Sequence, residues 1–456
     1  MIDEILRQQN SFFTSQRTKA IGYRLVYLKK FQKTLLKHEK AICKAIYEDF
    51  KKPKFESMVT ETQMVLSELK YIINHLEVWS KPIRVKGNLA NFPSFNWMYH
   101  EPYGKVLIIA PWNYPFLLTV SPLIGALAAG NTVVLKPSEL SPNTSKAILH
   151  LVTEVFPEEY VAVCEGGVEV SQTLLEQKWE YIFFTGSTHI GKLVYQRAAA
   201  QLTPVTLELG GKNPCIVDES AAIDLAAKRI TWGKFMNAGQ TCIAPDYILV
   251  HKTVKSKLVQ ALQKHIRNFY GEDMEASKDF ARIATQKHYD SLRKKLMGQE
   301  VLFGGENNDK TRFLSPTLVN EPGLESPLMQ DEIFGPILPI LSYDSESTLE
   351  KIITRYEKPL SLYIFSTRKN FQKKMIQKFG FGGGAINDVV VHIANKNLPF
   401  GGVGNSGIGA YHGKHSFELF SHKKAILERP NWMDIPFRYA PYKFPIKWAR
   451  YFRHLF

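Results

Sequence analysis

Apolar residues recur every three or four positions through the first eighty residues, and Lys and Arg occupy many of the positions between them. This period matches the turn of an α-helix and predicts amphipathic helices over residues 1–80. Cys43 falls on the apolar stripe and is expected in the core. Gly and Pro interrupt the pattern over residues 81–100, which is typical of an extended hairpin.

A second pattern begins at residue 104, where short apolar, β-rich runs alternate with helical stretches. The runs are GKVLIIAP, NTVVLKP, YVAVCEGG, YIFFTG and NPCIVD. After residue 242 come YILVH, a basic helix over 253–269, FLSPTLV, ILPILSY, SLYIFS and GGGAINDVVV. Strands that alternate with helices predict parallel sheets covered on both faces. The fold class is therefore α/β with two domains, and Cys164 and Cys215, inside the strand runs, are expected to be buried.

Residues 106–135 contain no charged side chain, and this stretch is long enough to cross a bilayer. Pro111, Pro115 and Pro122 would break a single helix, and Asn113 lies in the first third. The stretch is therefore predicted to form a buried strand, a turn, a helix and a second buried strand.

Composition fits a soluble globular protein, with 45% hydrophobic and 22% charged residues. The 58 Lys and Arg exceed the 43 Asp and Glu, giving a formal charge of +15. That excess favours anionic partners such as nucleic acid, acidic lipid or a phosphorylated cofactor, or it forms a basic solvated surface. The four cysteines include no CxxC pair, which predicts a protein of the reducing cytoplasm. The N-terminus, MIDEILRQQN, is acidic and lacks the apolar region of a signal peptide, so none is expected.

The last twenty residues, 437–456, contain five Lys or Arg and no acid. After Pro445, one helical face would carry Trp448, Phe452, Leu455 and Phe456. A basic stretch with aromatic anchors could lie on an anionic membrane surface, so that the protein would associate peripherally with the inner face of the membrane. It could equally be an arm that docks on its own protein or on a partner subunit.

Cys242 follows the polar, glycine-containing run NAGQT. A reactive cysteine needs solvent access and nearby positive potential or hydrogen-bond donors, and a turn of small residues can supply access and backbone N–H groups. The alternative is a structural cysteine. Asn113 follows the end of a predicted strand, where ligands bind in α/β sheets, so its amide could donate to an oxyanion. Its alternative is a cap for the next helix.

Three further stretches could bind a ligand. YIFFTGSTHIG places Gly186, Ser187 and Gly191 between a strand and a helix, where backbone N–H groups can bind phosphate. Glu208 precedes two glycines in an apolar segment, so it could be a base of raised pKa, or its carboxylate could bind a backbone amide. Glu332 precedes an aromatic residue and a tight turn. The glycines of residues 398–417 require close backbone packing or a loop that approaches a ligand.

The motifs TLELGGKNP, GQTC, EIFGP and PFGGVGNSG, in that order, resemble the aldehyde dehydrogenase superfamily over residues 10–425. FTGST and VLKPSE also fall where that family has them. The short N-terminus, PWNYPF, and YHGKHSF followed by FSH are similar to the class 3 branch, the fatty and aromatic aldehyde dehydrogenases.

The resemblance implies a mechanism. Cys242 matches the nucleophile that forms a thiohemiacetal, and the Asn113 side chain with the Cys242 N–H matches the oxyanion hole. Hydride passes to NAD(P)⁺ and leaves a thioester, and Glu208 matches the base that activates water. No metal is implied. The matches to cofactor contacts are Glu332 and Phe334 at the nicotinamide ribose, Lys136 and Glu139 at the adenosine ribose, and Gly186, Ser187, Thr188, His189, Ile190 and Gly191 near the pyrophosphate.

The resemblance also implies a Rossmann-like NAD(P)-binding domain from 1–80 and 101–209 and a catalytic domain from 210–390. Residues 81–100 and 391–430 would bridge the subunits of a homodimer, followed by a basic aromatic tail over 431–456. Glu139 would repel a 2′-phosphate, so NAD⁺ is expected first, with NADP⁺ open. The expected substrates are medium- or long-chain aliphatic, or aromatic, aldehydes.

Two other functions remain open. The thioester could pass to coenzyme A, although acylating relatives tend to lack the base matched by Glu208. The chain could instead be a catalytically idle scaffold, which the presence of Cys242, Glu208 and Asn113 opposes. Nucleic-acid binding is not expected, because there is no recognised module and no aromatic–basic interleaving outside the tail.

Overall fold

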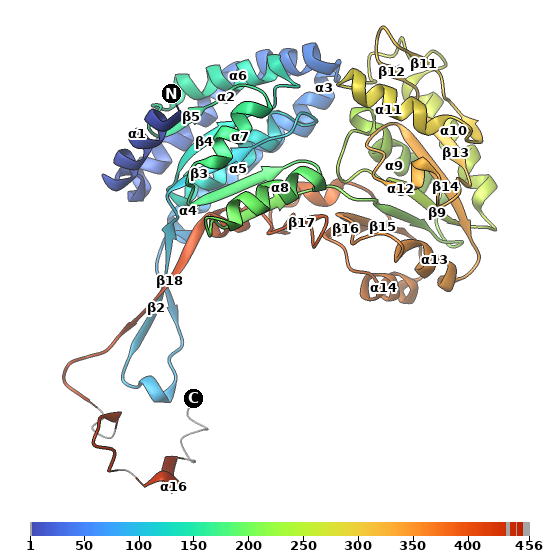
Figure 1. Ribbon diagram of the computed structural model, residues 1–456. Coiled ribbons are helices and arrows are strands. Elements are labelled where there is room, and N and C mark those ends of the chain that lie inside the picture. Colours follow the sequence, from blue (N-terminus) through green and yellow to red (C-terminus); the bar gives the residue numbers. More distant parts are fainter. Residues whose placement is uncertain (1, 435–437, 444, 450–456) are drawn as a thin grey trace.

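Two α/β lobes face each other, and a thin arm of strands projects from one of them (Figure 1). The computed structural model describes residues 2–434, 438–443 and 445–449. The lobes are named here by their sheets, the six-stranded lobe and the seven-stranded lobe. The predicted α/β class with two interleaved bodies is confirmed.

The N-terminal residues form the predicted helices, which pack on the six-stranded lobe. In α2 the buried positions include Leu28, Phe31 and Leu35, so the apolar stripe turns inward. Cys43 is on this stripe and is buried, as expected. One turn is wider than an α-helix, a π-helix over Met58–Thr62. The elements are α1 (Ile2–Thr14), a 3₁₀ turn (Arg17–Lys19), α2 (Ile21–Phe50), α3 (Lys54–Ser57), the π-helix and α4 (Gln63–Trp79).

The six-stranded sheet has the order β17-β7-β6-β3-β4-β5, parallel except for β17. Along β3, Val106 and Ile108 belong to one apolar cluster, with α2, α4, α5 and α6, whereas Leu107 and Ile109 belong to another, with α1, α7 and α8. Both faces are therefore covered, and the uncharged stretch is the predicted strand, helix and strand. The elements are β3 (Lys105–Ile109), α5 (Leu117–Ala129), β4 (Thr132–Lys136), α6 (Pro142–Val155), β5 (Val161–Val163), α7 (Val168–Glu176), β6 (Tyr181–Thr185), α8 (Thr188–Ala199), β7 (Val205–Glu208), β17 (Gly407–Ile408) and α15 (Lys414–Leu419).

The seven-stranded sheet has the order β10-β13-β14-β9-β8-β15-β16, parallel except for β10. Helices α9 and α10 share the main core with one face, whereas α13 and α14 pack on the other. The elements are β8 (Pro214–Val217), α9 (Ile223–Phe235), a 3₁₀ turn (Met236–Gly239), β9 (Tyr247–His251), α10 (Lys255–Tyr270), α11 (Gln286–Leu296), β10 (Val301–Phe303), β13 (Thr317–Asn320), α12 (Pro327–Gln330), β14 (Ile337–Tyr343), α13 (Glu346–Ile353), β15 (Ser361–Phe365), α14 (Lys369–Lys378), β16 (Gly383–Ile386) and a 3₁₀ turn (Val391–Ala394).

Two strand predictions need correction. FLSPTLV is not one strand, because Pro316, which has no N–H to donate, separates β12 (Phe313–Leu314) from β13. β12 pairs instead with β11 (Asn307–Asn308) in a separate hairpin. Cys164 is buried as expected but lies one residue beyond β5.

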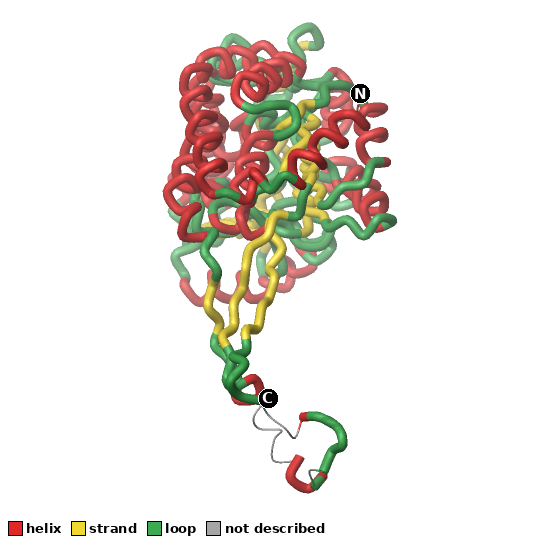
Figure 2. Tube along the Cα trace, turned by 90° about the vertical axis from the view of Figure 1, so that its left-hand side faces the viewer, coloured by secondary structure: helices red, strands yellow, loops and turns green. Residues whose placement is uncertain are grey.

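The arm is a three-stranded antiparallel sheet with β2 at its centre (Figure 2). It contains β1 (Ile83–Val85), a 3₁₀ turn (Leu89–Asn91), β2 (Phe95–Pro102) and β18 (Ser421–Glu428), which confirms the hairpin predicted over 81–100. β18 pairs with β2 along its whole length, yet all its residues after Ser421 are exposed. Beyond the arm, α16 (Ile446–Ala449) is the last described element, so the predicted helical face of Phe452, Leu455 and Phe456 lies outside the described residues.

None of the helices in the described part of the chain combines the length and apolar character that a membrane span requires.

Candidate active site

The site lies where strands of the six-stranded sheet end, facing the seven-stranded lobe. Parallel strands present their carboxyl ends at one edge of a sheet, where ligands bind. Asn113 follows β3, Gly186 follows β6 and Glu208 ends β7. Cys242 comes from the opposite lobe, in the loop before β9. Two cavities of about 170 Å³ and 230 Å³ meet there, and both are lined by Glu208 and Cys242.

A strained turn presents Cys242. Asn237, Ala238 and Gly239 all have left-handed backbone conformations, with φ values of 54°, 52° and 74°. A Cβ on Gly239 would lie 2.3 Å from the carbonyl oxygen of Gly335, so only glycine fits there. Non-glycine residues in this region carry a conformational cost and persist when their surroundings fix them.

Amide side chains hold this turn in place. Gln240 Nε2 donates to the carbonyl oxygens of Asn237 (2.9 Å) and Arg282 (3.1 Å). Its Oε1 accepts from the backbone N–H of Ala284 at 2.9 Å. Asn237 Nδ2 donates to the carbonyl oxygen of Asn113 at 2.9 Å, which connects the turn to the loop after β3. The two lobes are therefore joined by hydrogen bonds directly at the site.

Asn113 is an amide donor beside the thiol and does not cap α5. Its Nδ2 donates to the carbonyl oxygen of Gln240 at 3.0 Å, and the side chain is 4% exposed. An amide nitrogen carries two hydrogens. Within the described residues no acceptor is recorded for the second one, and Asn113 lines the larger cavity together with Cys242. This hydrogen can therefore be donated to a ligand bound there.

Cys242 is half-buried, while the other three cysteines are buried. Burial raises the pKa of its thiol, and the negative charges of Glu332 and Glu208 raise it further. The backbone N–H groups of Cys242 and Ile243 lower it. The sequence suggested nearby positive potential or donors. The structure supplies backbone donors, and the side chains that shift this pKa are acidic.

Glu208 is a carboxyl group kept from water and from partners. It is 3% exposed, and among the described residues neither carboxylate oxygen accepts a hydrogen bond. The alternative of a Glu bound to a backbone amide is therefore wrong. Burial raises the pKa of Glu208 well above its usual value. A carboxylate in such a place is a stronger base than an exposed one.

The larger cavity carries polar groups on one wall. Glu332 lies over a glycine pair: a Cβ on Gly210 would fall 2.1 Å from Glu332 Oε2. Burial raises the pKa of Glu332 to about 8, and the charge of Asp246 acts in the same direction. Phe334, at φ +54°, packs edge-on against Trp112 with ring centroids 5.5 Å apart. This wall offers an acid and two aromatic rings to a ligand.

The strand–helix junction after β6 reaches the same cavity only in part. Gly186 and Ser187 line it, and Ser187 Oγ caps α8 by accepting from Ile190 N at 3.4 Å. Thr188 donates to the carbonyl oxygen of Asn405, which ties α8 to the glycine-rich loop. The other four predicted residues of the junction do not line this cavity. They are Thr188, the exposed His189 and Ile190, and Gly191, which packs against Leu209.

Lys136 and Glu139 bind each other at the end of β4, outside both cavity linings. Lys136 is 2% exposed, and its Nζ donates to Glu139 Oε2 at 2.8 Å and to the carbonyl oxygen of Pro137 at 3.0 Å. Lys136 Nζ therefore reduces the negative charge that Glu139 presents.

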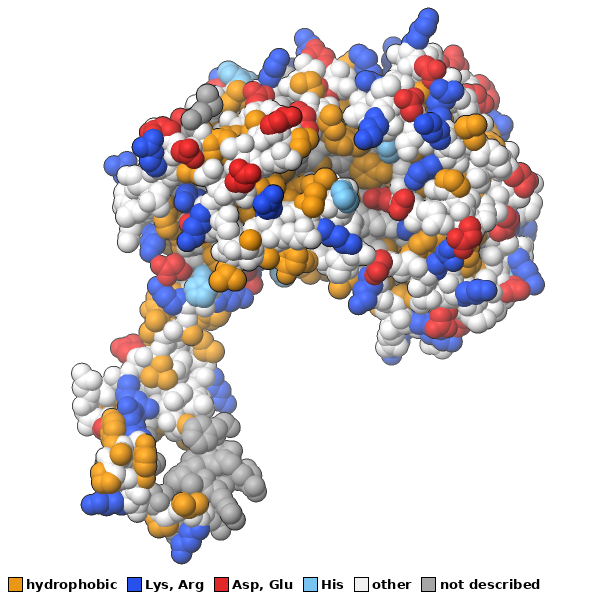
Figure 3. Space-filling view, viewed as in Figure 1, with side chains coloured by type: hydrophobic (Ala, Val, Ile, Leu, Met, Phe, Trp, Pro, Cys, Tyr) orange, Lys and Arg blue, Asp and Glu red, His pale blue; other side chains and the backbone are white. Residues whose placement is uncertain are grey.

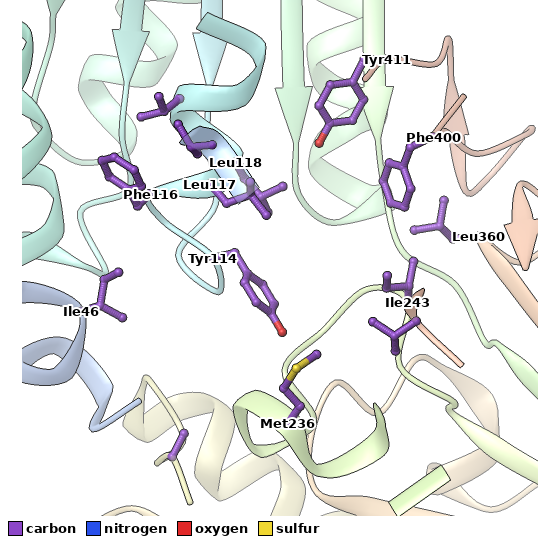
Figure 4. Packing of buried hydrophobic residues seen from close by; sticks show 14 of the residues in the cluster. Ile46, Tyr114, Phe116, Leu117, Leu118, Met236, Ile243, Leu360, Phe400 and Tyr411 are labelled. Carbon is purple, nitrogen blue, oxygen red and sulfur yellow. The ribbon is translucent and has the colours of Figure 1, made fainter. Parts of the chain in front are cut away.

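The smaller cavity is lined almost entirely by apolar and aromatic side chains. Tyr114 belongs to this wall, and its hydroxyl contacts Thr241 Oγ1 at 2.8 Å. In the space-filling view, hydrophobic side chains gather in the hollow between the lobes (Figure 3). Figure 4 shows part of the lining from close by: Tyr114, Leu117, Leu118, Met236, Ile243, Leu360, Phe400 and Tyr411.

Sequence reasoning did not identify these wall residues. Tyr114 could have been found, because it is adjacent to Asn113 in the PWNYPF motif. Leu360, Phe400 and Tyr411 come from distant segments that carry no signal of their own. The glycines of residues 398–417 do pack closely, since a Cβ on Gly402 would lie 2.1 Å from the carbonyl oxygen of Ser406.

Together, a thiol and a poorly solvated carboxylate line both an apolar cavity and a second cavity that also presents polar groups. This arrangement suits covalent catalysis by a cysteine on an apolar substrate, with a second ligand bound opposite.

Comparisons with known proteins agree with this class. A sequence model of the aldehyde dehydrogenase family matches residues 1–426. The 4,4′-diaponeurosporen-aldehyde dehydrogenase of Staphylococcus aureus is 46% identical over 454 residues, covering 99% of both chains. The dimeric NADP-preferring aldehyde dehydrogenase of Canis lupus familiaris is 41% identical, covering 96% of this chain and 98% of the relative. A solved substrate-bound state of S. aureus AldH superposes with a TM-score of 0.97 at 46% identity, covering 99% of both chains.

The chain belongs to the aldehyde dehydrogenase family, and its near relatives include family 3 members. It is an oxidoreductase that oxidises aldehydes with NAD(P)⁺.

Proposed function

We propose that the protein oxidises medium- to long-chain aliphatic or aromatic aldehydes to carboxylic acids, with Cys242 as the nucleophile. One observation carries the proposal: the thiol lines both an apolar cavity and a second cavity in which polar groups, among them Asn113 and Glu332, lie beside apolar ones. An apolar wall favours an apolar substrate tail by burial of its methylene groups. The names of the relatives, a diaponeurosporen-aldehyde dehydrogenase among them, fit such a substrate.

The aldehyde carbon is attacked by Cys242 as thiolate, which forms a C–S bond and moves the carbonyl electron pair to oxygen. The free amide hydrogen of Asn113 and the N–H of Cys242 donate to this oxyanion. NAD(P)⁺, when bound, would supply the acceptor for the hydride that leaves the same carbon with two electrons. Glu208 takes a proton from water, which attacks the resulting thioester. The C–S bond breaks, its electron pair returns to Cys242 as thiolate, and the carboxylic acid is released.

The residues of the larger cavity fit a nicotinamide nucleotide. Glu332 can accept from the nicotinamide ribose, with Phe334 beside it. Gly186 and Ser187 open α8, a helix of 12 residues whose N-terminus, from Thr188 to Gly191, suits pyrophosphate. Lys136 and Glu139 would contact the adenosine ribose. Glu139 favours a free 2′-hydroxyl and therefore NAD⁺, while its pairing with Lys136 leaves NADP⁺ acceptable.

The substrate class is tested by NADH formation with saturated aldehydes from acetaldehyde to dodecanal, and with benzaldehyde. Each added methylene is expected to raise kcat/KM by about fourfold while the chain still enters the cavity. A value that stays flat along the series would exclude recognition of the tail. Repeating the series with NADP⁺ separates cofactor preference from substrate preference.

The division of labour between the lobes completes the proposal. Residues 1–80 and 101–209 would bind the cofactor, and 210–390 would supply the nucleophile. The two sheets support this division. Strands β3–β7 form the six-stranded sheet together with β17, which comes from residues 391–430. Strands β8–β16, except for the β11–β12 hairpin, form the seven-stranded sheet. Residues 81–100 and 391–430 would contact a second copy, for which the exposed apolar side chains of the arm, such as Phe95, Ile426 and Leu427, are suited.

The tail after the arm would contact an anionic membrane surface. Tyr442 and Ile446 are 77% and 82% exposed, and Lys443 and Lys447 are exposed beside them. Aromatic and apolar anchors among cations suit an anionic interface.

Removal of residues 437–456 is expected to abolish binding to phosphatidylglycerol vesicles and to leave the protein dimeric, because the arm stays intact. Co-sedimentation with vesicles at low and high salt measures the first, and sedimentation equilibrium the second. Unchanged vesicle binding would exclude the tail as the contact. A monomeric full-length chain would exclude the dimer.

A further inference from the structure

A buried ion pair lies beneath the loop that carries Asn113. Lys52 Nζ donates to Glu61 Oε1 at 2.8 Å, and both side chains are 0% exposed. Removing charges from water costs several kcal/mol for each ion, so such pairs occur where their remaining hydrogen bonds are satisfied. Lys52 lies between α2 and α3, and Glu61 lies in the π-helix, so both are remote in sequence from Asn113 and Cys242.

Glu61 and Lys52 hold the segment directly after Asn113. Glu61 Oε2 accepts from the backbone N–H groups of Phe116 (2.9 Å) and Leu117 (3.2 Å), at the start of α5. α5 has no side-chain cap of its own, so Glu61 supplies it from another helix. Lys52 Nζ also lies 3.8 Å from the centre of the Tyr114 ring.

Glu56 holds the other half of the site. Its Oε1 accepts from the backbone N–H of Asn237 at 2.9 Å, and Asn237 is the first residue of the left-handed turn before Cys242. Asn237 is fully buried, so this carboxylate oxygen reaches a donor inside the protein. Because Asn237 Nδ2 also donates to the Asn113 carbonyl oxygen, Glu56 contacts the residue that joins nucleophile and amide.

The π-helix explains how two acids five residues apart reach the same site. In a regular α-helix, positions 56 and 61 would be about 140° apart around the axis. The wider turn over Met58–Thr62 reduces this angle, so both carboxylates turn toward the active-site loops. Val59 and Thr60, in the same turn, line the apolar cavity.

We infer that Glu56 is a positioning residue: its ionised carboxylate holds the 237–239 turn, and through it the Cys242 thiol and the Asn113 amide, in the reactive arrangement. The inference rests on the proposed roles of Cys242 and Asn113. It adds that a group outside both cavity linings makes oxidation depend on its own state of ionisation.

The groups around Glu56 set where it ionises. Glu56 is half-buried, and this desolvation raises its pKa to about 7. Glu61 and Asp279 act in the same direction, while Lys52 and the Asn237 N–H lower it. Tyr114 and Tyr270 also face it, and the charge of Glu56 raises the pKa of each. As pH falls through about 7, the carboxylate gains a proton and becomes a weaker acceptor for the Asn237 N–H.

The test compares Glu56→Gln with wild type across pH. Glutamine keeps an acceptor without the charge, so it should resemble the protonated acid. The ratio of wild-type to variant kcat is expected near one at about pH 6 and about fivefold or more above about pH 8. The rate of Cys242 alkylation by iodoacetamide should show the same ratio, since it reports the thiol without substrate. A ratio independent of pH would overturn the inference.

Glu39→Gln is the matched control. Glu39 accepts hydrogen bonds from the side chains of Thr62 and Gln63. Among the described residues it makes no hydrogen bond to the loops that carry Asn113 or Cys242, so the ratio of wild-type to Glu39→Gln kcat should not vary with pH. If Glu56→Gln fails to fold, Glu56→Asp keeps the charge on a shorter side chain. Lower kcat with the wild-type pH dependence is then expected, and loss of that dependence would contradict the inference.

Failure of this inference can be told from failure of the proposed function. If Cys242→Ala is inactive and the ratio of wild-type to Glu56→Gln kcat does not change with pH, only the proposed role of Glu56 is excluded. An active Cys242→Ala would remove the proposed mechanism itself.

Discussion

Cys242→Ala should abolish aldehyde oxidation, with kcat reduced by about 10⁴-fold or more, because it removes the thiol that forms the covalent intermediate in the proposed mechanism. The half-buried thiol is the sole cysteine lining either cavity at the site, within the chain as the structure describes it. NADH formation from decanal measures the loss. The folded state should be retained, since alanine keeps the Cβ and removes one partly exposed sulfur atom.

Cys164→Ala is the control for that substitution. Cys164 is also a free thiol near a strand end, but it packs in the cluster with Leu174 and Trp179, away from both cavities. Its activity should remain close to wild type. Residual oxidation by Cys242→Ala above about one hundredth of wild type would mean that another group forms the bond to substrate.

Glu208→Gln should separate the two halves of the reaction. The variant is expected to form about one NADH per chain in a rapid burst and then to turn over about 10²- to 10⁴-fold more slowly, because water lacks its base. The acyl group should be visible on Cys242 by mass spectrometry of the quenched enzyme. Stopped-flow absorbance gives the burst amplitude, and the absence of both burst and acyl group would place Glu208 before hydride transfer.

The same variant should be more stable than wild type. The folded-state pKa of Glu208 is raised, so the carboxylate destabilises the fold as pH rises above the unfolded value of about 4.3. Glutamine removes that penalty, and the gain measured by denaturant unfolding should be small in acid and larger toward neutral pH. Glu180→Gln is the control. Glu180 accepts from the backbone N–H of Lys105 at the amino ends of the strands of the same sheet, far from the candidate site. This variant should change neither the NADH burst nor the pH dependence of stability.

Sequence reasoning placed three candidate site residues at the ends of strands, and the structure has them there. Asn113, Gly186 and Glu208 lie next to apolar runs that end together, because parallel strands share one carboxyl edge. Cys242 could be selected because the polar turn before it is unusual among buried segments. Each of these residues could be recognised because the feature that marks it, an apolar run or a polar turn, is adjacent to it in the sequence.

Other features depended on contacts between distant segments. The apolar wall combines Leu360, which precedes β15 of the seven-stranded sheet, with Phe400 and Tyr411, which flank β17 of the six-stranded sheet. These residues meet because the chain returns from one lobe to the other after β16. The acidic surroundings of Cys242 could not be read from its local sequence, since Glu208 and Glu332 come from distant segments, one in each lobe. Glu56 was hidden for a similar reason: a π-helical turn shifts its direction, and the apolar period gives no sign of that shift.

The arm has a mechanical consequence. β2 ends at Pro102 and β3 begins at Lys105, so two residues connect the arm to the strand that leads to Asn113. β18 follows α15, which packs on α5 in the same lobe. On its third side, the arm is joined to α4, which ends at Trp79 and is followed by three residues before β1 begins at Ile83. Three covalent attachments resist the rotation that a single linker would permit. The arm is therefore a rigid extension of the six-stranded lobe and not a flexible linker. A molecule bound at its far end would be held at a fixed angle to the carboxyl ends of the strands that carry the candidate site.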